Sequence, residues 1–297
     1  MDIVVFSRLI RVKQWIKNLF VLAPMAFAGR FLDPVSLVIA GKAFLSFCLI
    51  SSGVYIFNDL VDRHRDALHP KKRLRPLASG EVSVASAVIL TAVFVLGGMS
   101  LAFSLGYEFV FLSGAYLFLH GLYNFAGKKI VLVDVGCIAL GFCLRVWAGA
   151  VAVSIVPTVW LQMCVFLLAL FLGFTKRRSE MVALQEKSEE HREVLRHYSL
   201  YFLDQLILIS ATLVIVFYGL YTISPDIVAR AHGYGMVYSL GFVIYGMFRY
   251  LYLVHVKKAG DDPGEILTGD LPMLLAVTVW ILYVGSILYF FNGWLAC

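Results

Sequence analysis

The sequence predicts an all-α protein that crosses a membrane several times. Hydrophobic residues make up 61% of the 297 residues and charged residues only 15%, and the mean hydropathy is +0.85, whereas soluble domains are roughly 45–50% apolar. The charged residues also stand in short groups between long apolar stretches. We therefore predict a single domain over residues 1–297 with nine helices of bilayer-spanning length: 14–31, 35–58, 83–103, 107–125, 131–153, 157–175, 200–222, 233–256 and 271–295.

The N-terminal segment has a pattern of its own. Residues 1–13 combine Arg8, Arg11 and Lys13 with apolar residues, which favours an interfacial amphipathic helix over a cleavable signal peptide. The first span is short and contains Pro24, which interrupts helical hydrogen bonding. It is therefore the least regular of the nine predicted helices.

The basic residues predict the orientation of the chain. Of the 25 Lys and Arg residues, 20 lie at the N-terminal end and in the loops after even-numbered spans, and three lie on the opposite face. Because cytoplasmic loops carry an excess of Lys and Arg, we predict a multi-pass protein of a bacterial-type inner membrane with its N-terminus and active site facing the cytoplasm. Such a face favours contact with the lipid bilayer and phosphorylated substrates. Nucleic acid is excluded as a partner, because no soluble domain is available to bind it.

The second predicted span ends in a group of oxygen-bearing side chains. On a helix, its amide and three carboxylates share an arc of about a quarter turn, in the sequence Asn58-Asp59-Leu-Val-Asp62-Arg-His-Arg-Asp66. Carboxylates this close repel one another unless a cation lies between them. Since the arc offers only oxygen ligands, it predicts a Mg²⁺ site formed by these four side chains.

Basic residues follow the acidic motif closely. Pro70 ends the predicted helix, and the stretch 76–80 predicts a turn that folds the basic run back toward the carboxylates. Acids to bind Mg²⁺ beside bases to bind phosphate indicate a diphosphate site in a cytoplasmic loop over about 58–82; a solvated juxtamembrane loop is the alternative. The bases are Arg63, Arg65, Lys71, Lys72, Arg73 and Arg75.

A second polar cluster is expected to open a cytoplasmic loop over about 176–199. It reads Lys176-Arg177-Arg178-Ser179-Glu180, and on a helix Lys176, Arg177 and Glu180 share a 100° arc. The mixed-charge run 185–197 is interpreted as a solvated helix with internal ion pairs. The acidic stretch 261–270 either covers the site or forms an ordinary acidic turn.

One basic residue falls inside a predicted span. Arg145 lies near the middle of 131–153, where an Arg costs at least roughly 2.5–3.5 kcal/mol, so it should face a polar cavity and an anion. Asp134 lies eleven residues earlier and points the same way. The two residues either serve one cavity, which we favour, or form a structural charge link through a neighbour. Lys17, beside Asn18 at the mouth of the first span, is a further candidate donor to phosphate.

Taken together, these motifs resemble the UbiA superfamily of intramembrane prenyltransferases, over nearly the whole chain. The resemblance implies a ring of helices around a central cavity open to the membrane, with Mg²⁺ bridging aspartates and a diphosphate. Members that use prenyl diphosphates carry a second aspartate-rich motif after span six. Here that position holds three bases and one acid, at 176–180.

This departure, with the segments Gln14-Trp15-x-Lys17-Asn18 and Leu144-Arg145-x-x-Ala-Gly149, resembles the decaprenyl-phosphate 5-phosphoribosyltransferase branch. That branch implies phosphoribosyl pyrophosphate as donor, polyprenyl phosphate as acceptor and a product that is a precursor of cell-wall arabinose. The implied roles are catalysis for Asp59, Asp62, Asp66 and Arg145, and substrate binding for Lys17, Asn58, Lys71, Arg73, Arg75, Lys176, Arg177 and Glu180.

Two other functions compete with this interpretation. A UbiA-type prenyltransferase acting on an aromatic or other lipophilic acceptor would share the first motif but would need aspartates after span six. A secondary transporter would show inverted repeats and polar residues along broken helices, whereas no repeat is evident and the polar residues gather on one face. Polyprenyl length, acceptor identity and oligomeric state are left open by the sequence.

Overall fold

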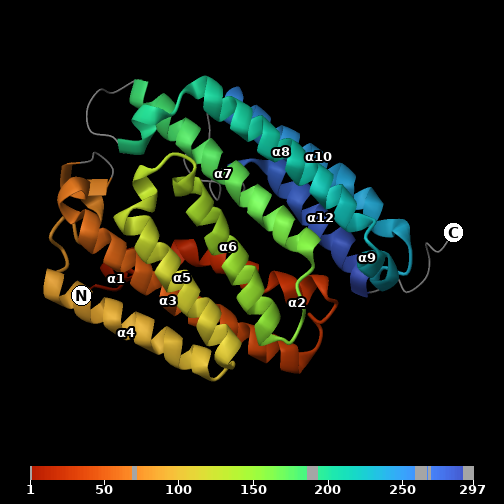
Figure 1. Ribbon diagram of the computed structural model, residues 1–297, viewed down its shortest axis with the longest axis horizontal. Coiled ribbons are helices and arrows are strands. Elements are labelled where there is room, and N and C mark those ends of the chain that lie inside the picture. Colours follow the sequence, from red (N-terminus) through yellow and green to blue (C-terminus); the bar gives the residue numbers. More distant parts are fainter. Residues whose placement is uncertain (1, 69–71, 186–192, 258–265, 267–268, 290–297) are drawn as a thin grey trace. The chain divides into compact units, whose positions relative to one another are not determined.

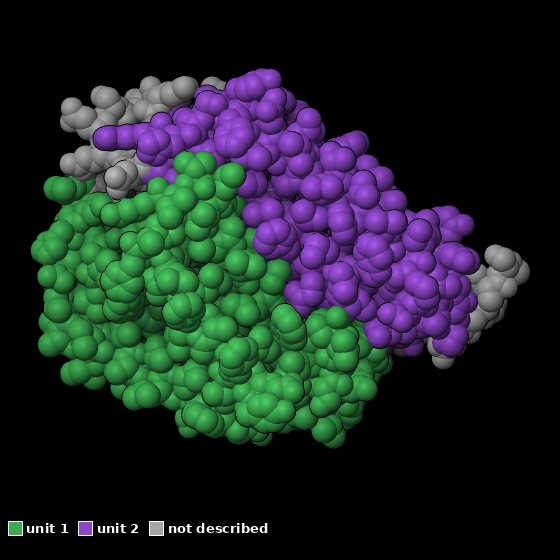
Figure 2. All heavy atoms as spheres, in the orientation of Figure 1, with its two compact units in different colours: residues 1–157 green, residues 158–297 purple. Residues whose placement is uncertain are grey.

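The structure is a computed structural model that describes residues 2–68, 72–185, 193–257, 266 and 269–289. Every regular element in these ranges is helical (Figure 1), which confirms the all-α class. The chain divides into two compact units, residues 1–157 and residues 158–297, which Figure 2 colours separately. The single domain expected over 1–297 stays a prediction.

Unit 1 is built around a long helix that carries the acidic motif at its C-terminal end. This helix, α3, packs along α4, and α5 packs along α6 (Figure 1). The elements of the unit are α1 (Ile3–Leu9), η1 (Val12–Val21), α2 (Ala23–Phe27), α3 (Pro34–Leu68), η2 (Lys72–Leu74), α4 (Val84–Phe103), α5 (Tyr107–Phe125), η3 (Gly127–Lys129) and α6 (Val133–Ala152).

Small residues allow α3 and α4 to approach closely. A Cβ atom added at Gly53 would lie 2.6 Å from Val95 Cγ2, and one added at Gly98 would lie 2.9 Å from the carbonyl oxygen of Ser46. The Ser46 hydroxyl in turn donates a hydrogen bond of 2.8 Å to the Gly98 carbonyl. Small residues at such contacts bring two membrane helices together, and here they fix the course of α3 toward its polar end.

The segment before α3 differs from the continuous span expected over 14–31. It forms the ten-residue 3₁₀ helix η1 and the five-residue helix α2, with Pro24 in the first turn of α2. Proline lacks the N–H that a continuing helix would need, so the chain starts a new short helix there. Arg11, with φ 54°, separates α1 from η1. The interfacial helix expected over 1–13 is therefore confined to α1, with η1 beginning at Val12.

In its described residues, unit 2 has four long helices and three short ones. Its elements are α7 (Val159–Gln185), η4 (Glu193–His197), α8 (Leu200–Thr222), α9 (Pro225–Arg230), η5 (Tyr234–Ser239), α10 (Leu240–His255) and α12 (Leu271–Tyr289). Helix α7 packs along α8, and α10 packs against α12. The prediction of a loop from residue 176 onward is wrong for 176–185, which continue α7. The physical reason is that 174–199 contain neither Gly nor Pro to end the helix.

Seven helices in the described ranges are long and apolar enough to cross a membrane, which makes the chain a multi-pass membrane protein. The nine predicted spans are not confirmed. The first is broken, and α5, which carries Glu108, His120 and Asn124, is not among the seven. The central cavity stays a prediction. The seven span candidates are Pro34–Leu68, Val84–Phe103, Val133–Ala152, Val159–Val182, Leu200–Thr222, Tyr234–His255 and Leu271–Tyr289.

Candidate functional site

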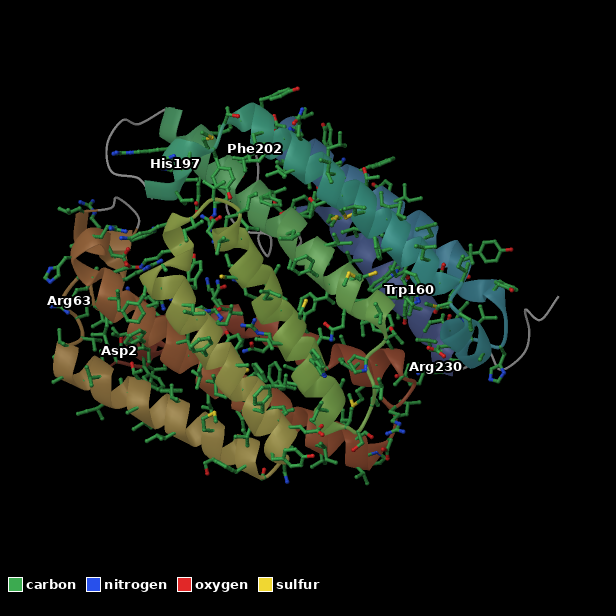
Figure 3. All side chains as sticks on the ribbon, in the orientation of Figure 1. Asp2, Arg63, Trp160, His197, Phe202 and Arg230 are labelled. Carbon is green, nitrogen blue, oxygen red and sulfur yellow. The ribbon has the colours of Figure 1, made fainter. Side chains whose placement is uncertain are left out.

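The four side chains of the acidic motif all lie on the last three turns of α3, on the same stretch as Arg63, which Figure 3 labels. Asp59 and Asp66 are only 2% and 3% exposed, and Asp62 is half-buried. A buried carboxylate loses its hydration and is rarely found without a partner. The burial of this motif therefore requires compensating positive charge.

Three basic side chains supply that charge. Arg75 bridges two acids, donating to Asp59 Oδ1 at 3.0 Å and to Asp66 Oδ2 at 2.6 Å. Arg11 donates to the same Asp59 oxygen. Lys128 donates to Asp62 Oδ1 at 2.7 Å. The prediction that the basic run folds back onto the carboxylates is confirmed for Arg75, and the site gains two bases from other segments.

Arg11 and Lys128 were not among the predicted site residues. Both counted toward the orientation of the chain, and Arg11 also toward the N-terminal interfacial helix, although each lies on the same predicted membrane face as the acids. Arg11 has a left-handed backbone, and its guanidinium carbon lies 5.1 Å from the centroid of the Tyr55 ring. Lys128 belongs to η3, the short connection between α5 and α6. Only the shared face could have marked the two bases as candidates, because neither lies near the motif in sequence.

The donor set fits Mg²⁺ that is shared with a phosphate ligand. Asn58 Oδ1 is buried and has no hydrogen-bond partner in the described part of the chain, so it is one oxygen available to a cation. No group of three or more acidic, His or Cys side chains in that part could hold a metal by itself. Mg²⁺, however, is commonly held by one or two carboxylates together with substrate phosphates. Joint binding of one ion by Asn58, Asp59, Asp62 and Asp66 stays a prediction.

The other predicted phosphate-binding residues of unit 1 lie in different surroundings. Arg73 is exposed on η2, and Lys17 is half-buried on η1. Lys71 lies outside the described residues. Of the basic run between α3 and α4, Arg75 is thus the residue that the structure brings to the acids.

Arg145 is buried on α6 with an exposure of 4%. Its guanidinium donates to Asn18 Oδ1 at 2.8 Å, to the Tyr116 hydroxyl at 2.7 Å and to the Gly141 carbonyl at 3.0 Å. It also lies 4.7 Å and 5.2 Å from the ring centroids of Tyr116 and Phe142. These contacts are with neutral groups rather than with the anion we expected, and they join η1, α5 and α6. A catalytic part for Arg145 stays a prediction.

In unit 2, the predicted second cluster at 176–180 lies in the C-terminal part of α7. We expect this end of the helix to face the cytoplasm. Arg177 is only 1% exposed and donates to Glu180, one helical turn away. Lys176 is half-buried beside it. Arg178, which the sequence had not distinguished from its neighbours, donates from Nε to Asp204 Oδ1 on α8 at 2.5 Å. Glu180 therefore serves first as the counter-ion of a buried arginine.

Asp270 is the described acid of the stretch 261–270, of which residues 261–265 and 267–268 lie outside the described residues. Its carboxylate accepts from Arg249 Nε at 3.0 Å and from Nη2 at 2.7 Å, and it also accepts from the backbone N–H of Met273 at 3.0 Å. These contacts tie α10 to the start of α12. We therefore interpret Asp270 as a residue of an ordinary acidic turn that stabilises local structure, rather than as part of a segment that covers the site.

Comparison with known proteins identifies the family. The UbiA prenyltransferase family matches residues 18–264. The decaprenyl-phosphate phosphoribosyltransferase of Mycolicibacterium smegmatis is 30% identical over 292 residues, which cover 95% of this chain and 91% of that protein. The protein of the same name from Mycobacterium tuberculosis H37Rv is 30% identical over 287 residues, which cover 95% and 93%.

Solved structures agree on the fold. A UbiA homolog from Archaeoglobus fulgidus bound to GPP and Mg²⁺ superimposes with a TM-score of 0.72 at 18% identity, covering 96% of this chain and 99% of that one. The same homolog bound to Cd²⁺ gives a TM-score of 0.68 at 18% identity, covering 96% and 99%. At this level of identity the likeness concerns the fold alone. With the family match over most of its length, the chain belongs to the UbiA prenyltransferase family and is a membrane-embedded transferase.

Proposed function

We propose that this protein transfers the 5-phosphoribosyl group of phosphoribosyl pyrophosphate to a polyprenyl phosphate of the decaprenyl type, with Mg²⁺ as cofactor. The product is a lipid-linked phosphoribose that serves as a precursor of cell-wall arabinose. The observation that carries the proposal is the buried cluster at the end of α3, where three carboxylates form ion pairs with Arg11, Arg75 and Lys128. Relatives that cover nearly the whole chain support this choice of substrates.

The reaction requires little covalent participation by the protein. The bond between the anomeric carbon and the diphosphate breaks, positive charge develops on the sugar, and a bond forms to an oxygen of the acceptor phosphate. The acceptor is already an anion, so no strong general base is needed. Positioning of the two substrates and electrostatic stabilisation of the leaving diphosphate then supply most of the rate enhancement.

The residues of the cluster suit that task. Asp62 and Asp66, with Asn58, would hold Mg²⁺, which when bound supplies positive charge for the leaving diphosphate. Arg75 and Lys128 lie on the same carboxylates and are long enough to reach phosphate oxygens. Arg11 keeps the buried charge of Asp59 compensated. In unit 2, we propose that Lys176 and Arg177 donate to phosphate, with Glu180 orienting Arg177.

The test is a direct transfer assay with the purified full-length protein. Phosphoribosyl pyrophosphate labelled in the ribose is incubated with decaprenyl phosphate and Mg²⁺, and the lipid fraction is counted. We expect label in the lipid and release of diphosphate, both abolished by a chelator. If no label reaches the lipid, while a prenyl diphosphate alkylates an aromatic acceptor, the proposed substrates are wrong and the family's other chemistry applies.

A further inference from the structure

The carboxylates of the acid–base cluster in unit 1 are ion-paired before any ligand binds. Each of the three carboxylates at the end of α3 contacts at least one of the bases Arg11, Arg75 and Lys128. A divalent cation added to this arrangement would face three positive groups within a few ångströms, in surroundings where charges interact strongly. Mg²⁺ alone is therefore a poor ligand for the cluster.

The bases also occupy the oxygens that a metal would need. Asp59 Oδ1 accepts from two guanidinium groups, Asp66 Oδ2 accepts from Arg75, and Asp62 Oδ1 accepts from Lys128. A cation that binds these oxygens must displace at least one of these donors. The displaced donor then needs another anion, because an unpaired charge in a partly buried site is costly.

The three bases differ in how firmly they are held. Arg11 combines a left-handed backbone, a cation–π contact with Tyr55 and an ion pair with Asp59, which is 2% exposed. Arg75 is 30% exposed and comes from the connection between α3 and α4. Lys128 is only 14% exposed, but its charge stands at the end of a flexible stem that can turn from one oxygen to a neighbouring one within the site. Arg75 and Lys128 are thus the bases that can leave, whereas Arg11 stays with Asp59.

We propose that Arg75 and Lys128 are exchangeable counter-ions that make metal binding dependent on a diphosphate group. Without ligand they hold Asp62 and Asp66; when a diphosphate arrives with the metal, they transfer to its oxygens and release the two carboxylates to the cation. Asp59 stays neutralised by Arg11. This inference rests on the proposed function, because it takes a diphosphate as the anion that binds this cluster.

Metal binding by the full-length protein tests the proposal without catalysis. Equilibrium dialysis with Mn²⁺ as a spectroscopically visible substitute for Mg²⁺ measures its affinity with and without inorganic pyrophosphate, after correction for the complex that the two form in solution. We expect pyrophosphate to raise the affinity of the wild-type protein for Mn²⁺ by about tenfold or more, the scale of one charge-assisted contact. Equal affinity in both conditions would overturn the proposal.

The decisive variant is Arg75→Gln. It should bind Mn²⁺ alone about tenfold more tightly than the wild type, because Asp66 Oδ2 loses its competing donor while Asp59 Oδ1 keeps only Arg11, and pyrophosphate should add much less. Local damage to the site would weaken metal binding, so a tighter Mn²⁺ complex separates the exchange from a structural role. Lys13→Gln, which removes an exposed charge of the same unit, should match the wild type. Unchanged or weaker Mn²⁺ binding by Arg75→Gln contradicts the exchange.

Lys128→Gln provides the same test if Arg75→Gln cannot be purified, with the same expected direction. The result does not depend on the proposed substrates, because phosphoribosyl pyrophosphate and prenyl diphosphates both carry a diphosphate group. Coupled binding without phosphoribosyl transfer would refute the proposed substrates and leave the exchange standing. Phosphoribosyl transfer without coupled binding would refute the exchange and leave the proposed function standing.

Discussion

At the scale of single residues, the carboxylates of α3 have unequal surroundings although they share one motif. Asp59 is almost fully buried and accepts from both Arg11 and Arg75, whereas Asp62 is half-buried and pairs with a single flexible lysine. A carboxylate between two guanidinium groups contributes chiefly by holding them. A carboxylate with a single lysine partner, such as Asp62, can bind a metal after the loss of one contact. The motif therefore combines a fixed charge pair with exchangeable ligands.

The first prediction concerns Asp62. Asp62→Ala should abolish Mg²⁺-dependent turnover while the protein still inserts into membranes and purifies, because Asp62 is half-buried and has a single basic partner, Lys128. Turnover is measured by transfer of radiolabel to the lipid. Asp66→Ala should also abolish turnover in this assay. Full activity in either variant would remove that residue from the mechanism.

The second prediction concerns the basic cluster of α7. Arg177→Ala should raise the KM for phosphoribosyl pyrophosphate by about ten- to a hundredfold, because one charge-assisted contact to phosphate contributes roughly 1.5–3 kcal/mol. The KM for the lipid phosphate should change much less, and Lys176→Ala should show the same contrast. Lys257→Ala, an exposed base in the same unit, is the control. An equal rise in both KM values would indicate a general loss of structure.

The acidic motif was predictable at this scale, and its partners were not. Asn58 to Asp66 are contiguous, so the period of one helix suffices to place them on one face. Arg11 and Lys128 come from segments 48 and 66 residues distant from the acids they bind, and no local pattern predicts such pairs. Arg145 was predicted to bind an anion because of its charge, yet Asn18, Tyr116 and Gly141 satisfy it with neutral oxygens.

At the scale of elements, unit 1 depends on a close contact between α6 and η1. A Cβ atom added at Gly149 would lie 1.8 Å from the carbonyl oxygen of Val21, and backbone atoms cannot yield as a flexible side chain can. This contact places η1 beside α6, and Asn18 on η1 accepts from Arg145 on that helix. The glycine thus positions a segment whose irregular path the sequence predicts poorly.

The third prediction follows from that contact. Gly149→Ala should lower the free energy of unfolding by at least about 1–3 kcal/mol, the typical cost of overpacking, and should lower the thermal midpoint measured in detergent. Gly136→Ala is the matched control on the same helix, because an added Cβ meets no atom within 4 Å there and alanine favours a helix over glycine. A Gly149→Ala protein as stable as the Gly136→Ala protein would contradict the contact.

The fourth prediction concerns the link between α10 and α12. The hydrogen bonds from Arg249 lower the pKa of Asp270 below its ordinary value, and the backbone N–H of Met273 acts in the same direction. A carboxyl whose pKa is lowered by folding stabilises the fold above its unfolded pKa of about 3.9, and this stabilisation is lost as the pH falls through the folded value. Asp270→Asn should therefore reduce the acid sensitivity of thermal unfolding below about pH 4.

The measurement is the thermal midpoint of wild type and Asp270→Asn from pH 7 down to pH 3. The difference between the two should be largest at neutral pH and should shrink as the pH falls. A constant difference at every pH would show that the carboxylate charge of Asp270 has no part in stability.

The elements themselves were predictable where hydropathy is strong and local signals agree. The expected span 107–125 coincides with α5, and 83–103 differs from α4 by one residue. Residues 12–21 were not predictable as they fold, because 3₁₀ geometry gives no apolar repeat of 3.6 residues. Residues 176–185 were assigned to a loop from their charge alone, although nothing in them ends a helix.

At the scale of the whole molecule, composition was enough to predict a multi-pass all-α protein, and the motif at 58–66 pointed to the family that now matches residues 18–264. The number of spans was harder to predict. Polar residues inside α5 and the break at Pro24 lower the apolar content that defines a span, yet such segments can still lie within a membrane protein when neighbouring helices cover them. Hydropathy thus identifies the class more reliably than it counts the helices.

The last prediction concerns orientation, which rests on the distribution of Lys and Arg. Since 20 of the 25 lie on one predicted face, and positive residues stay in the cytoplasm, a cysteine-directed reagent that cannot cross membranes should label a tag after Cys297 in intact cells. A tag within 63–80 should be labelled only after the cells are opened. A cysteine-free background, with the tag supplying the reactive thiol, keeps the native cysteines from contributing.

The same experiment bears on the site, because the proposed donor is a water-soluble sugar diphosphate made in the cytoplasm. Arg75 lies within the tested stretch and contacts Asp59 and Asp66, so the side to which this stretch is exposed is the side from which the donor must enter. Labelling of 63–80 from outside intact cells, with the C-terminal tag protected, would put the acid–base cluster on the outer face. Phosphoribosyl pyrophosphate could not reach it there, and the proposed donor would fall together with the predicted orientation.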